Sequence, residues 1–168
     1  MNELPLLPDD MRPVLRDFLN EQSPMALATA GEKDGRPQVA PLFFASDDGF
    51  NLYWISSPDS RHSRNIADWN DVAATIYAHT WEWAGIKGVQ IEGDALPVTD
   101  EDGERQRALA LYKAKFPFVN DRFEPLMDQS VIYVLRPRWI RWLDNARRLG
   151  YKQEFRLEPV DSGTPAGG

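Results

Sequence analysis

Apolar residues near the N-terminus recur at helical spacing, at Met11, Leu15 and Phe18. Asp9 and Asp10, just before them, are residue types that favour the start of a helix. Polar residues occupy most of the intervening positions. The pattern predicts an amphipathic helix that buries one face against the rest of the chain.

The pattern then changes to short runs typical of strands, separated by turn residues. Residues 25–30 and 37–44 flank a polar segment containing Asp34-Gly35, which predicts a hairpin. Asp47-Asp48-Gly49 predicts a second turn, and residues 50–55 are rich in types that suit a half-buried strand. We expect these three strands to form an antiparallel meander.

Beyond the third strand, a break at residues 56–60 precedes a short helix predicted over residues 61–70, with Ile66 and Trp69 facing inward. Two more strands are predicted over residues 72–78 and 88–98. The order of elements so far is typical of an antiparallel sheet because the connections between strands are short.

The last third of the chain contains one helix and two more strands. The acids of residues 99–102 open a helix that should end before Phe116-Pro117. A sixth strand is predicted over residues 131–143, and Arg136-Pro137-Arg138 predicts an edge, bend or break in it because proline cannot donate to a ladder. A short final strand is expected over residues 151–157.

Many strands and few helices predict an α+β chain that is mainly β with flanking helices, organised as a small antiparallel barrel. A length of 168 residues suits one compact domain. We expect this domain to span residues 1–158, including the N-terminal helix. Residues 159–168 are rich in Gly, Pro and Ser, which predicts a disordered tail.

Composition excludes several classes of function. The chain has no cysteine, so a disulfide framework, a Cys-ligated metal site and a thiol nucleophile are excluded. A formal charge of -7 disfavours binding to nucleic acid. No apolar run approaches the roughly 20 residues that span a bilayer. The first residues lack the pattern of a secretory signal, so we expect a cytoplasmic protein without a membrane anchor.

Six tryptophans are a heavy aromatic load for this length. Trp81, Trp83, Trp139 and Trp142 lie in two pairs, and a small barrel cannot bury all four internally. Two interpretations remain open. They can pack in the core and at a partner surface, or they can form a platform for a flat ring.

The segment from Ser56 to Asn65 is the most informative stretch for chemistry. It places hydroxyls, two guanidiniums and an imidazole where a strand gives way to a helix. Free backbone N–H groups at a helix start, reinforced by arginine, form an anion site that suits a phosphate monoester. The alternative is a solvated helix start that Ser60 caps and whose arginines are merely exposed.

Several segments in this order resemble the pyridoxamine 5'-phosphate oxidase-like FMN-binding split barrels. The first group comprises Gly35-Arg36-Pro37, Tyr53-Trp54-Ile55-Ser56-Ser57, Ser60-Arg61-His62 and Asn65-Ile66, followed by the strand that starts after Trp69-Asn70-Asp71. The later group is similar to a bacterial branch of that family and comprises residues 86–93, 112–117, Trp142-Leu143-Asp144-Asn145 and Gly150-Tyr151-Lys152. The resemblance covers roughly residues 10 to 157.

The resemblance implies an antiparallel FMN-binding split β-barrel and a homodimer with flavin sites at the interface. Arg61 and His62 occupy the phosphate-binding segment, with His62 in place of the family's lysine, which implies a weaker or pH-sensitive grip. The other implied cofactor positions are Ser56 and Ser57 near the ribityl phosphate, the backbone at Leu42, Phe43 and Phe44 beside the ring, the polar Lys87 and Gln90, Trp142 from the partner subunit, and Asn145 and Lys152.

Each implied position also has a plain structural interpretation. Trp142 can be interface packing, Lys87 an exposed strand charge and Gln90 an outward residue on a solvated face. The acids of residues 100–104 suit a helix start, so we expect no metal site. His79 at a strand end is expected to be a hydrogen-bonded structural residue.

The sequence therefore predicts an FMN-dependent oxidoreductase that acts on an unidentified small molecule, with no catalytic side chain assigned. Pyridoxamine phosphate oxidases carry a substrate-binding Arg-Leu-His-Asp-Arg segment, whereas residues 145–152 here are different, which argues against that reaction. Two alternatives stay open: a flavin carrier or sensor without catalysis, and a haem-binding relative with His62 or His79 as axial ligand.

Overall fold

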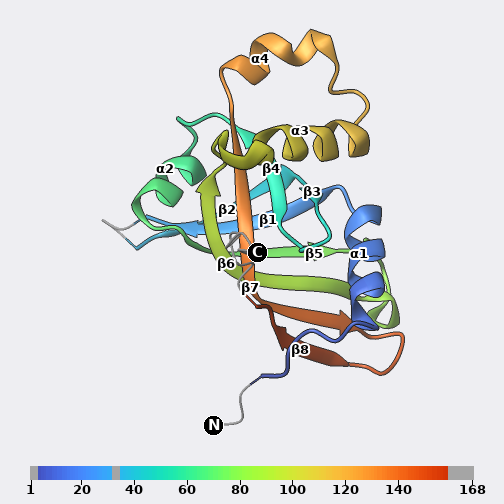
Figure 1. The fold of residues 1–168 in the computed structure, drawn as a ribbon. Helices are drawn as coiled ribbons and strands as arrows, with labels where there is room; N and C mark the ends of the chain where they lie inside the picture. The colour runs from blue at the N-terminus through green and yellow to red at the C-terminus, as the bar shows by residue number, and fades with distance from the viewer. Residues whose placement is uncertain (1–3, 32–34, 159–168) are drawn as a thin grey trace, which may run out of the picture.

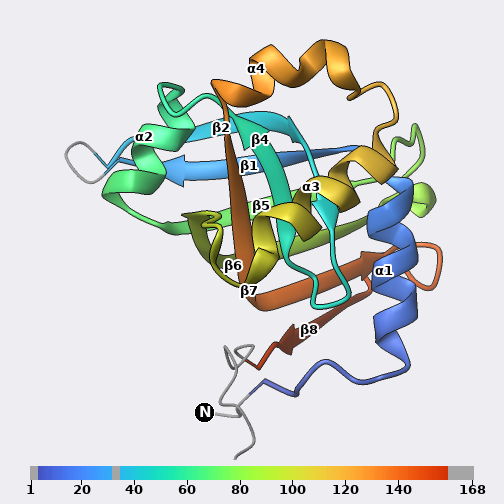
Figure 2. The same cartoon turned by 45° about the horizontal axis from the view of Figure 1, so that its top comes forward.

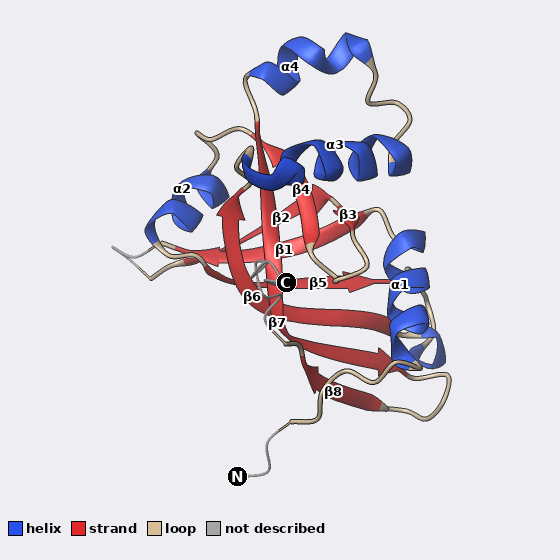
Figure 3. Ribbon diagram, in the orientation of Figure 1, coloured by secondary structure: helices blue, strands red, loops and turns tan. Residues whose placement is uncertain are grey.

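The computed structural model describes residues 4–31 and 35–158, so the predicted tail at 159–168 lies outside the described residues. The helices are α1 Met11–Glu21, α2 Arg61–Asp68, α3 Glu104–Lys115 and α4 Glu124–Asp128. The strands are β1 Pro24–Ala30, β2 Pro37–Phe43, β3 Ala45–Ser46, β4 Leu52–Ser56, β5 Asp71–Tyr77, β6 Lys87–Pro97, β7 Val131–Asp144 and β8 Lys152–Arg156. Figures 1 and 3 show these elements.

The strands form one curled sheet in the order β2-β1-β5-β6-β7-β4-β3, with β8 beside β7. Every pair of strands is antiparallel. Helices lie around the sheet, with α1 along one side and α3 and α4 at the top of Figure 1. The predicted class, mainly β with flanking helices in an antiparallel split barrel, is confirmed.

The two ends of this sheet are joined by the chain itself. Among the residues that the structure describes, β2 pairs only with β1, and after the single residue Phe44 the chain continues as β3, which pairs with β4. Phe44 is fully buried, and its N–H donates to the Ser23 carbonyl at 3.2 Å. The predicted turn at residues 47–49 is present, but the third strand of the expected meander pairs with β3 and not with β2.

β7 bends where the sequence predicted a bend. The register against β6 shifts between Glu92 and Gly93, so that Gly93 lies opposite Pro137. A Cβ on Gly93 would lie 2.0 Å from the Arg136 carbonyl oxygen, so only glycine fits this close approach. On its other edge β7 pairs with β4 up to Leu135 and with β8 from Trp139 onward. Pro137 therefore stands between two partners, where its missing N–H costs little.

The apolar stripe of α1 packs into the main core, as predicted, through Met11, Leu15, Phe18 and Leu19. Ile66 of α2 is also buried, but Trp69 is 54% exposed, so its predicted inward orientation is wrong. The reason is that α2 ends at Asp68 and the chain turns into extended backbone at Trp69. Figure 2 shows α2 and α1 on opposite sides of the barrel.

Lys115 connects α3 to α1. Its Nζ donates to the Leu19 carbonyl at 2.9 Å, near the end of α1, and lies 3.9 Å from the centre of the Phe44 ring. Burial lowers the pKa of Lys115 to about 8. The Lys115 ammonium caps the C-terminal end of α1, but its apolar surroundings disfavour the charged form.

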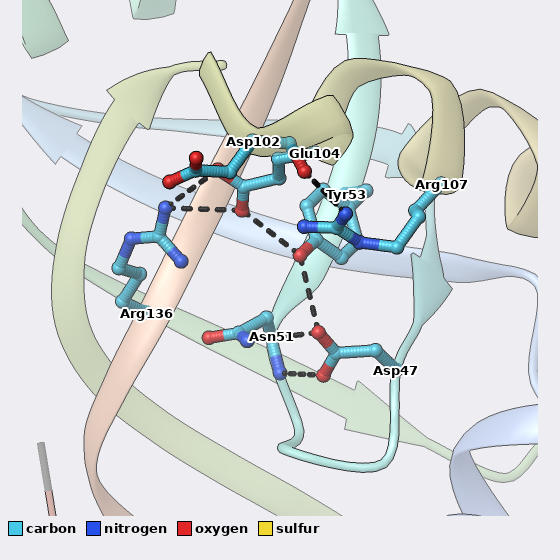
Figure 4. Close-up of polar contacts among 7 residues, drawn as sticks. All are labelled: Asp47, Asn51, Tyr53, Asp102, Glu104, Arg107 and Arg136. Atoms are coloured by element: carbon cyan, nitrogen blue, oxygen red, sulfur yellow. Dashed lines mark hydrogen bonds and ion pairs between the residues drawn. The ribbon is translucent and has the colours of Figure 1, made fainter. Parts of the chain in front are cut away.

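A polar network joins the β3–β4 turn to α3 and β7 (Figure 4). The Tyr53 hydroxyl lies 3.1 Å from Asp47 Oδ2 and 3.0 Å from Glu104 Oε1, and one Arg136 amino group donates to both Glu104 oxygens. Asn51 donates to Asp47 through both its backbone and its side chain. Burial, reinforced by the two carboxylates, raises the pKa of Tyr53 well above its usual range. This network borders a cavity of about 990 Å³.

We predict that Tyr53→Phe lowers the free energy of unfolding by about 1 to 2 kcal/mol, because two carboxylates lose the donor that they share. Urea denaturation at pH 7 measures the change. Tyr77→Phe is the matched control, because Tyr77 is 65% exposed at the end of β5. Equal stabilities for both variants would contradict a stabilising role for the network.

We predict that the stability of the chain rises between pH 8 and pH 10 and that Lys115→Met removes this rise. The folded pKa is about 8, below the ordinary value of 10.5, so the unfolded chain binds the proton that the folded chain has lost. The free energy of unfolding then increases with pH in this window, by about 1 to 2 kcal/mol after allowance for partial solvation. Urea midpoints measured across this range, with Lys113→Met as control, check the difference.

Candidate functional site

The end of β4 and the start of α2 bring together four predicted site residues, which are Ser56, Ser57, Arg61 and His62. The Ser56 hydroxyl lies 2.7 Å from His62 Nε2, and the Ser60 hydroxyl lies 3.0 Å from the same nitrogen. Ser60 caps α2, because its hydroxyl oxygen accepts from the Ser63 N–H at 3.2 Å. The Ser57 hydroxyl accepts from the Asp59 N–H at 3.2 Å, which shapes the connecting loop.

His62 does not act as a cation at this junction near neutral pH. Its side chain is buried, and burial lowers its pKa from 6.5. A neutral imidazole that is hydrogen-bonded to Ser56 and Ser60 orders the two hydroxyls and does not replace the charge of the family's lysine. Near neutral pH His62 therefore contributes hydrogen bonds to this junction and no positive charge that could attract a phosphate.

The two arginines of this segment differ in their surroundings. Arg64 donates from Nη1 to the Asp59 carbonyl, so its guanidinium is tied to the loop. Arg61 is exposed at the first position of α2 and makes no hydrogen bond or ion pair with residues in the described part of the chain. In the first turn of α2 the Ser63 N–H is capped by the Ser60 hydroxyl and the Arg64 N–H donates to the Ser60 carbonyl. The Arg61 and His62 N–H groups have no earlier helical carbonyl to bind, so these two groups and the Arg61 guanidinium are available to an anion.

Helix α2 is held rigidly against the sheet beneath it. Asn65 Nδ2 donates to Thr29 Oγ1 of β1 at 3.0 Å, and both side chains are buried. Ile66 packs in the main core. The sequence indicated Asn65 only through the family resemblance, because its partner Thr29 lies 36 positions away.

A gap in hydrogen bonding separates β2 from β4, and Leu42, Phe43 and Phe44 lie along it. β2 pairs with β1 on one edge only, so within residues 35–158 its other edge has no strand partner. Leu42 is half-buried, Phe43 is exposed and Phe44 is in the core. The free edge therefore offers backbone N–H and C=O groups, which is the role that the resemblance implies for this strand.

The remaining predicted residues lie elsewhere in the chain. β6 is three strand spacings from β2 along the sheet, or ~14 Å, which separates Lys87 and Gln90 from the free edge. Gln90 Oε1 accepts from Arg141 at 2.9 Å on the outer face. Lys152 is exposed on β8. Asn145 Nδ2 donates to the Trp83 carbonyl at 2.8 Å, which ties the chain after β7 to the loop before β6.

Trp142 does not have the position expected of an aromatic that reaches a partner's flavin. Its side chain is 2% exposed and meets the Phe18 ring edge-on at 5.1 Å, inside its own barrel. The alternation along β7 turns Ile140 and Trp142 inward, and Trp139 and Arg141 outward. Trp81 and Trp83 are strongly exposed in the loop between β5 and β6, where His79 contacts the Trp81 ring and lies in solvent.

The outer face of the sheet has a shallow groove of about 330 Å³. Its floor is formed by small side chains of β1 and β5, among them Ala26, Ala28 and Ala73. Val39 and Trp139 stand at its sides. The sequence contained this signal as the alternation of small residues in two predicted strands, but only the pairing of β1 with β5 places them side by side.

Neither a membrane-spanning helix nor a metal cluster is seen in the described ranges. No helix there is long and apolar enough to cross a bilayer. Residues 4–31 and 35–158 contain no group of three His, Asp or Glu side chains placed to hold a metal ion.

Comparisons with known proteins agree with this architecture. The family model for pyridoxamine 5'-phosphate oxidase matches residues 11–144. A UPF0306 protein of Pasteurella multocida is 25% identical over 145 residues, which cover 86% of this chain and 91% of that protein.

Solved structures show the same fold at low sequence identity. A haem-binding protein of Mycobacterium smegmatis superposes with a TM-score of 0.71 and 18% identity, over 90% of this chain and 60% of that one. A FAD-binding protein of Mesorhizobium loti gives a TM-score of 0.57 and 21% identity, over 76% of this chain and 88% of that one. The family match spans the barrel, α2 and the bent strand β7, so the chain belongs to the pyridoxamine 5'-phosphate oxidase family.

Proposed function

We propose that this protein binds FMN in the gap between β2 and β4 and acts as an FMN-dependent oxidoreductase on a small molecule. One observation carries the proposal: an open anion site at the start of α2 lies at the end of β4, next to a gap whose other side is the free edge of β2. The flavin binding typical of the family supports it.

The phosphate end of FMN fits the junction of β4 and α2. A phosphate monoester needs hydrogen-bond donors and positive charge, which the first turn of α2 and Arg61 supply. Ser56 and Ser57 add hydroxyls at the same strand end. The chain carries a net charge of -7, so Arg61 has to supply local positive charge in a chain that otherwise repels anions.

The ring end of FMN fits the edge of β2. The polar rim of an isoalloxazine carries alternating donors and acceptors, which backbone groups of residues 40–43 that face away from β1 can match. Pro41 on this strand has no N–H, so this position offers only its carbonyl. FMN supplies the redox chemistry when bound, and the protein orients it and limits access of water.

A haem site is the second candidate, because a structural neighbour of this fold binds haem. The two histidines of this chain are poorly suited to axial ligation. His62 Nε2 is already bonded to Ser56 and Ser60, and His79 lies in an exposed loop beside Trp81. The site geometry therefore favours FMN over haem.

We also propose a homodimer that brings the outer faces of two sheets together. The groove floor of Ala26, Ala28 and Ala73 allows close approach of a flat partner. Gln90 of β6 lines this groove, at a distance from the chain's own β2 edge, whereas Lys87 lies on the opposite face of β6, with its Nζ 6.0 Å from the centre of the Trp142 ring. In such a dimer Gln90 would serve the flavin of the partner subunit.

We predict that Arg61→Ala raises the Kd for FMN by about ten- to a hundredfold, the value of a lost charge-assisted hydrogen bond of ~1.5 to 3 kcal/mol. Arg64→Ala should have a much smaller effect, because the Arg64 guanidinium is tied to the Asp59 carbonyl. Quenching of flavin fluorescence on titration measures both constants.

Equal small effects of the two substitutions would place the phosphate elsewhere. A wild-type protein that ignores FMN and shows a sharp Soret band with added haem would favour the haem alternative. Turnover distinguishes an enzyme from a carrier or sensor: bound flavin that is reduced by NADH or NADPH and rapidly reoxidised by an added acceptor supports the enzyme.

We predict that the wild type sediments as a dimer and that Ala73→Arg converts it into a monomer, because an arginine in the centre of the flat floor prevents close contact of the two faces. The same variant should lose FMN affinity by about tenfold or more, since the partner's contacts are removed. Sedimentation velocity and FMN titration measure the two effects.

Ala110→Arg is the matched control for this experiment. Ala110 is exposed on α3, away from the groove, so this variant should remain dimeric with unchanged FMN affinity. A monomeric wild type that binds FMN tightly would overturn the shared site.

A further inference from the structure

The segment from Phe116 to Ser130, here called the arm, crosses the gap between β2 and β4. At its start the Phe116 ring stacks on Phe43 of β2, with centres 5.1 Å apart and planes at 28°. At its end the next residue, Val131, pairs with Ser56 of β4. Both strands that border the proposed flavin site therefore anchor the arm, and Figures 1 and 2 show α4 of the arm above the barrel.

The arm has a defined internal structure. Val119 is buried with Phe116 and Tyr112 in a small cluster, and Met127 packs against that cluster. Burial raises the pKa of Tyr112 to about 12, which reflects these apolar surroundings. The Val119 N–H donates to the Phe116 carbonyl at 2.9 Å, and the Ser130 hydroxyl donates to the Leu126 carbonyl at 2.7 Å. The hydrogen bonds order the two ends of the arm, and the small apolar cluster attaches the arm to Tyr112 of α3.

Three phenylalanines on the two sides of this crossing remain exposed. Phe43 is 46% exposed, Phe118 is 50% exposed and Phe123 is 37% exposed. Their rings form a row: Phe118 lies 6.1 Å from Phe43 and 5.9 Å from Phe123, each in an edge-to-face arrangement. Within the described ranges, no arginine or lysine lies over any of the three rings.

We propose that Phe43, Phe118 and Phe123 form the substrate-facing wall of the flavin site and select planar, uncharged aromatic molecules. The proposal rests on the proposed FMN site, because Phe43 belongs to the strand that would border the flavin ring. Adjacent rings offer faces and edges to a flat apolar molecule. Lys115 Nζ lies 5.8 Å from the centre of the adjoining Phe116 ring but donates to the Leu19 carbonyl. A charged molecule would therefore lose hydration against the three rings without gaining a partner there.

The row of rings suits a small molecule better than a protein. It comprises three side chains, whereas a stable protein interface involves roughly 20 to 30 residues on each side. Because the row of rings lies over the gap, an aromatic ligand bound to it would lie beside the flavin. Electron transfer requires the ring of the ligand to be close to the flavin ring. The arm is thus an element of specificity, and α2 with Arg61 remains the element that binds the cofactor.

The test uses the FMN-loaded protein with oxidised flavin and menadione as the uncharged probe, measured by equilibrium dialysis. Phe118→Ala and Phe123→Ala should each weaken menadione binding by about tenfold, a typical loss for removal of an aromatic anchor, while the Kd for FMN stays at the wild-type value. Leu149→Ala is the matched control, because Leu149 is an exposed apolar residue in the turn after β7. It should leave both affinities unchanged.

Each other outcome overturns a defined part of the proposal. If the wild type does not bind FMN, both the proposed function and the proposed aromatic wall are contradicted. If the wild type binds FMN but the variants bind menadione as tightly as the wild type does, only the aromatic wall is contradicted. Menadione and a sulfonated naphthoquinone bound equally well would contradict selection for uncharged molecules. Phe118→Leu retains an apolar side chain in the arm, so an intermediate menadione affinity with an unchanged circular dichroism spectrum excludes unfolding as the cause.

Discussion

The arrangement of the barrel depends on one change of partner at Phe44. β2 ends its pairing with β1 at Phe43, and after one intervening residue the chain pairs with β4 as β3, from Ala45 onward. Because Phe44 is fully buried and its N–H is bonded to Ser23, this point cannot move without opening the core. The barrel is therefore closed by the chain itself, while the edge of β2 stays unpaired along the gap.

The two faces of the sheet consequently meet different requirements. The inner face is covered by large, fully buried apolar side chains, including Trp54 and Trp142, which form the main core. The outer face has small residues at its centre and polar ones around them, which suits contact with another flat surface. Lys115 and the network around Tyr53 attach α3 at the top of the barrel, and α3 in turn positions the arm over the gap.

The proposed binding of an anion by this acidic chain would rely on local geometry more than on total charge. Burial lowers the pKa of His62, which is hydrogen-bonded to Ser56 and Ser60, so the exposed Arg61 guanidinium and the free N–H groups at the start of α2 would carry the attraction. This arrangement separates two tasks. A hydrogen-bonded histidine fixes the shape of the junction, and Arg61 remains able to meet a ligand because no carboxylate in the described ranges engages it.

Local patterns in the sequence were enough to predict most elements, because helix periodicity at Met11 to Leu19, the turn residues at 47–49 and the proline of β7 each act over a few residues. They were also enough to bring Ser56, Ser57, Arg61 and His62 together, since these residues are neighbours in the chain.

The tertiary structure alone decided the rest. Pairing at long range turned Trp142 into the core, exposed Trp69, separated Gln90 from the β2 edge, and placed Phe118 beside Phe43, which lies 75 positions earlier in the chain. Alternation along a strand shows which residues share a face, but only closure of the barrel determines which face is inside.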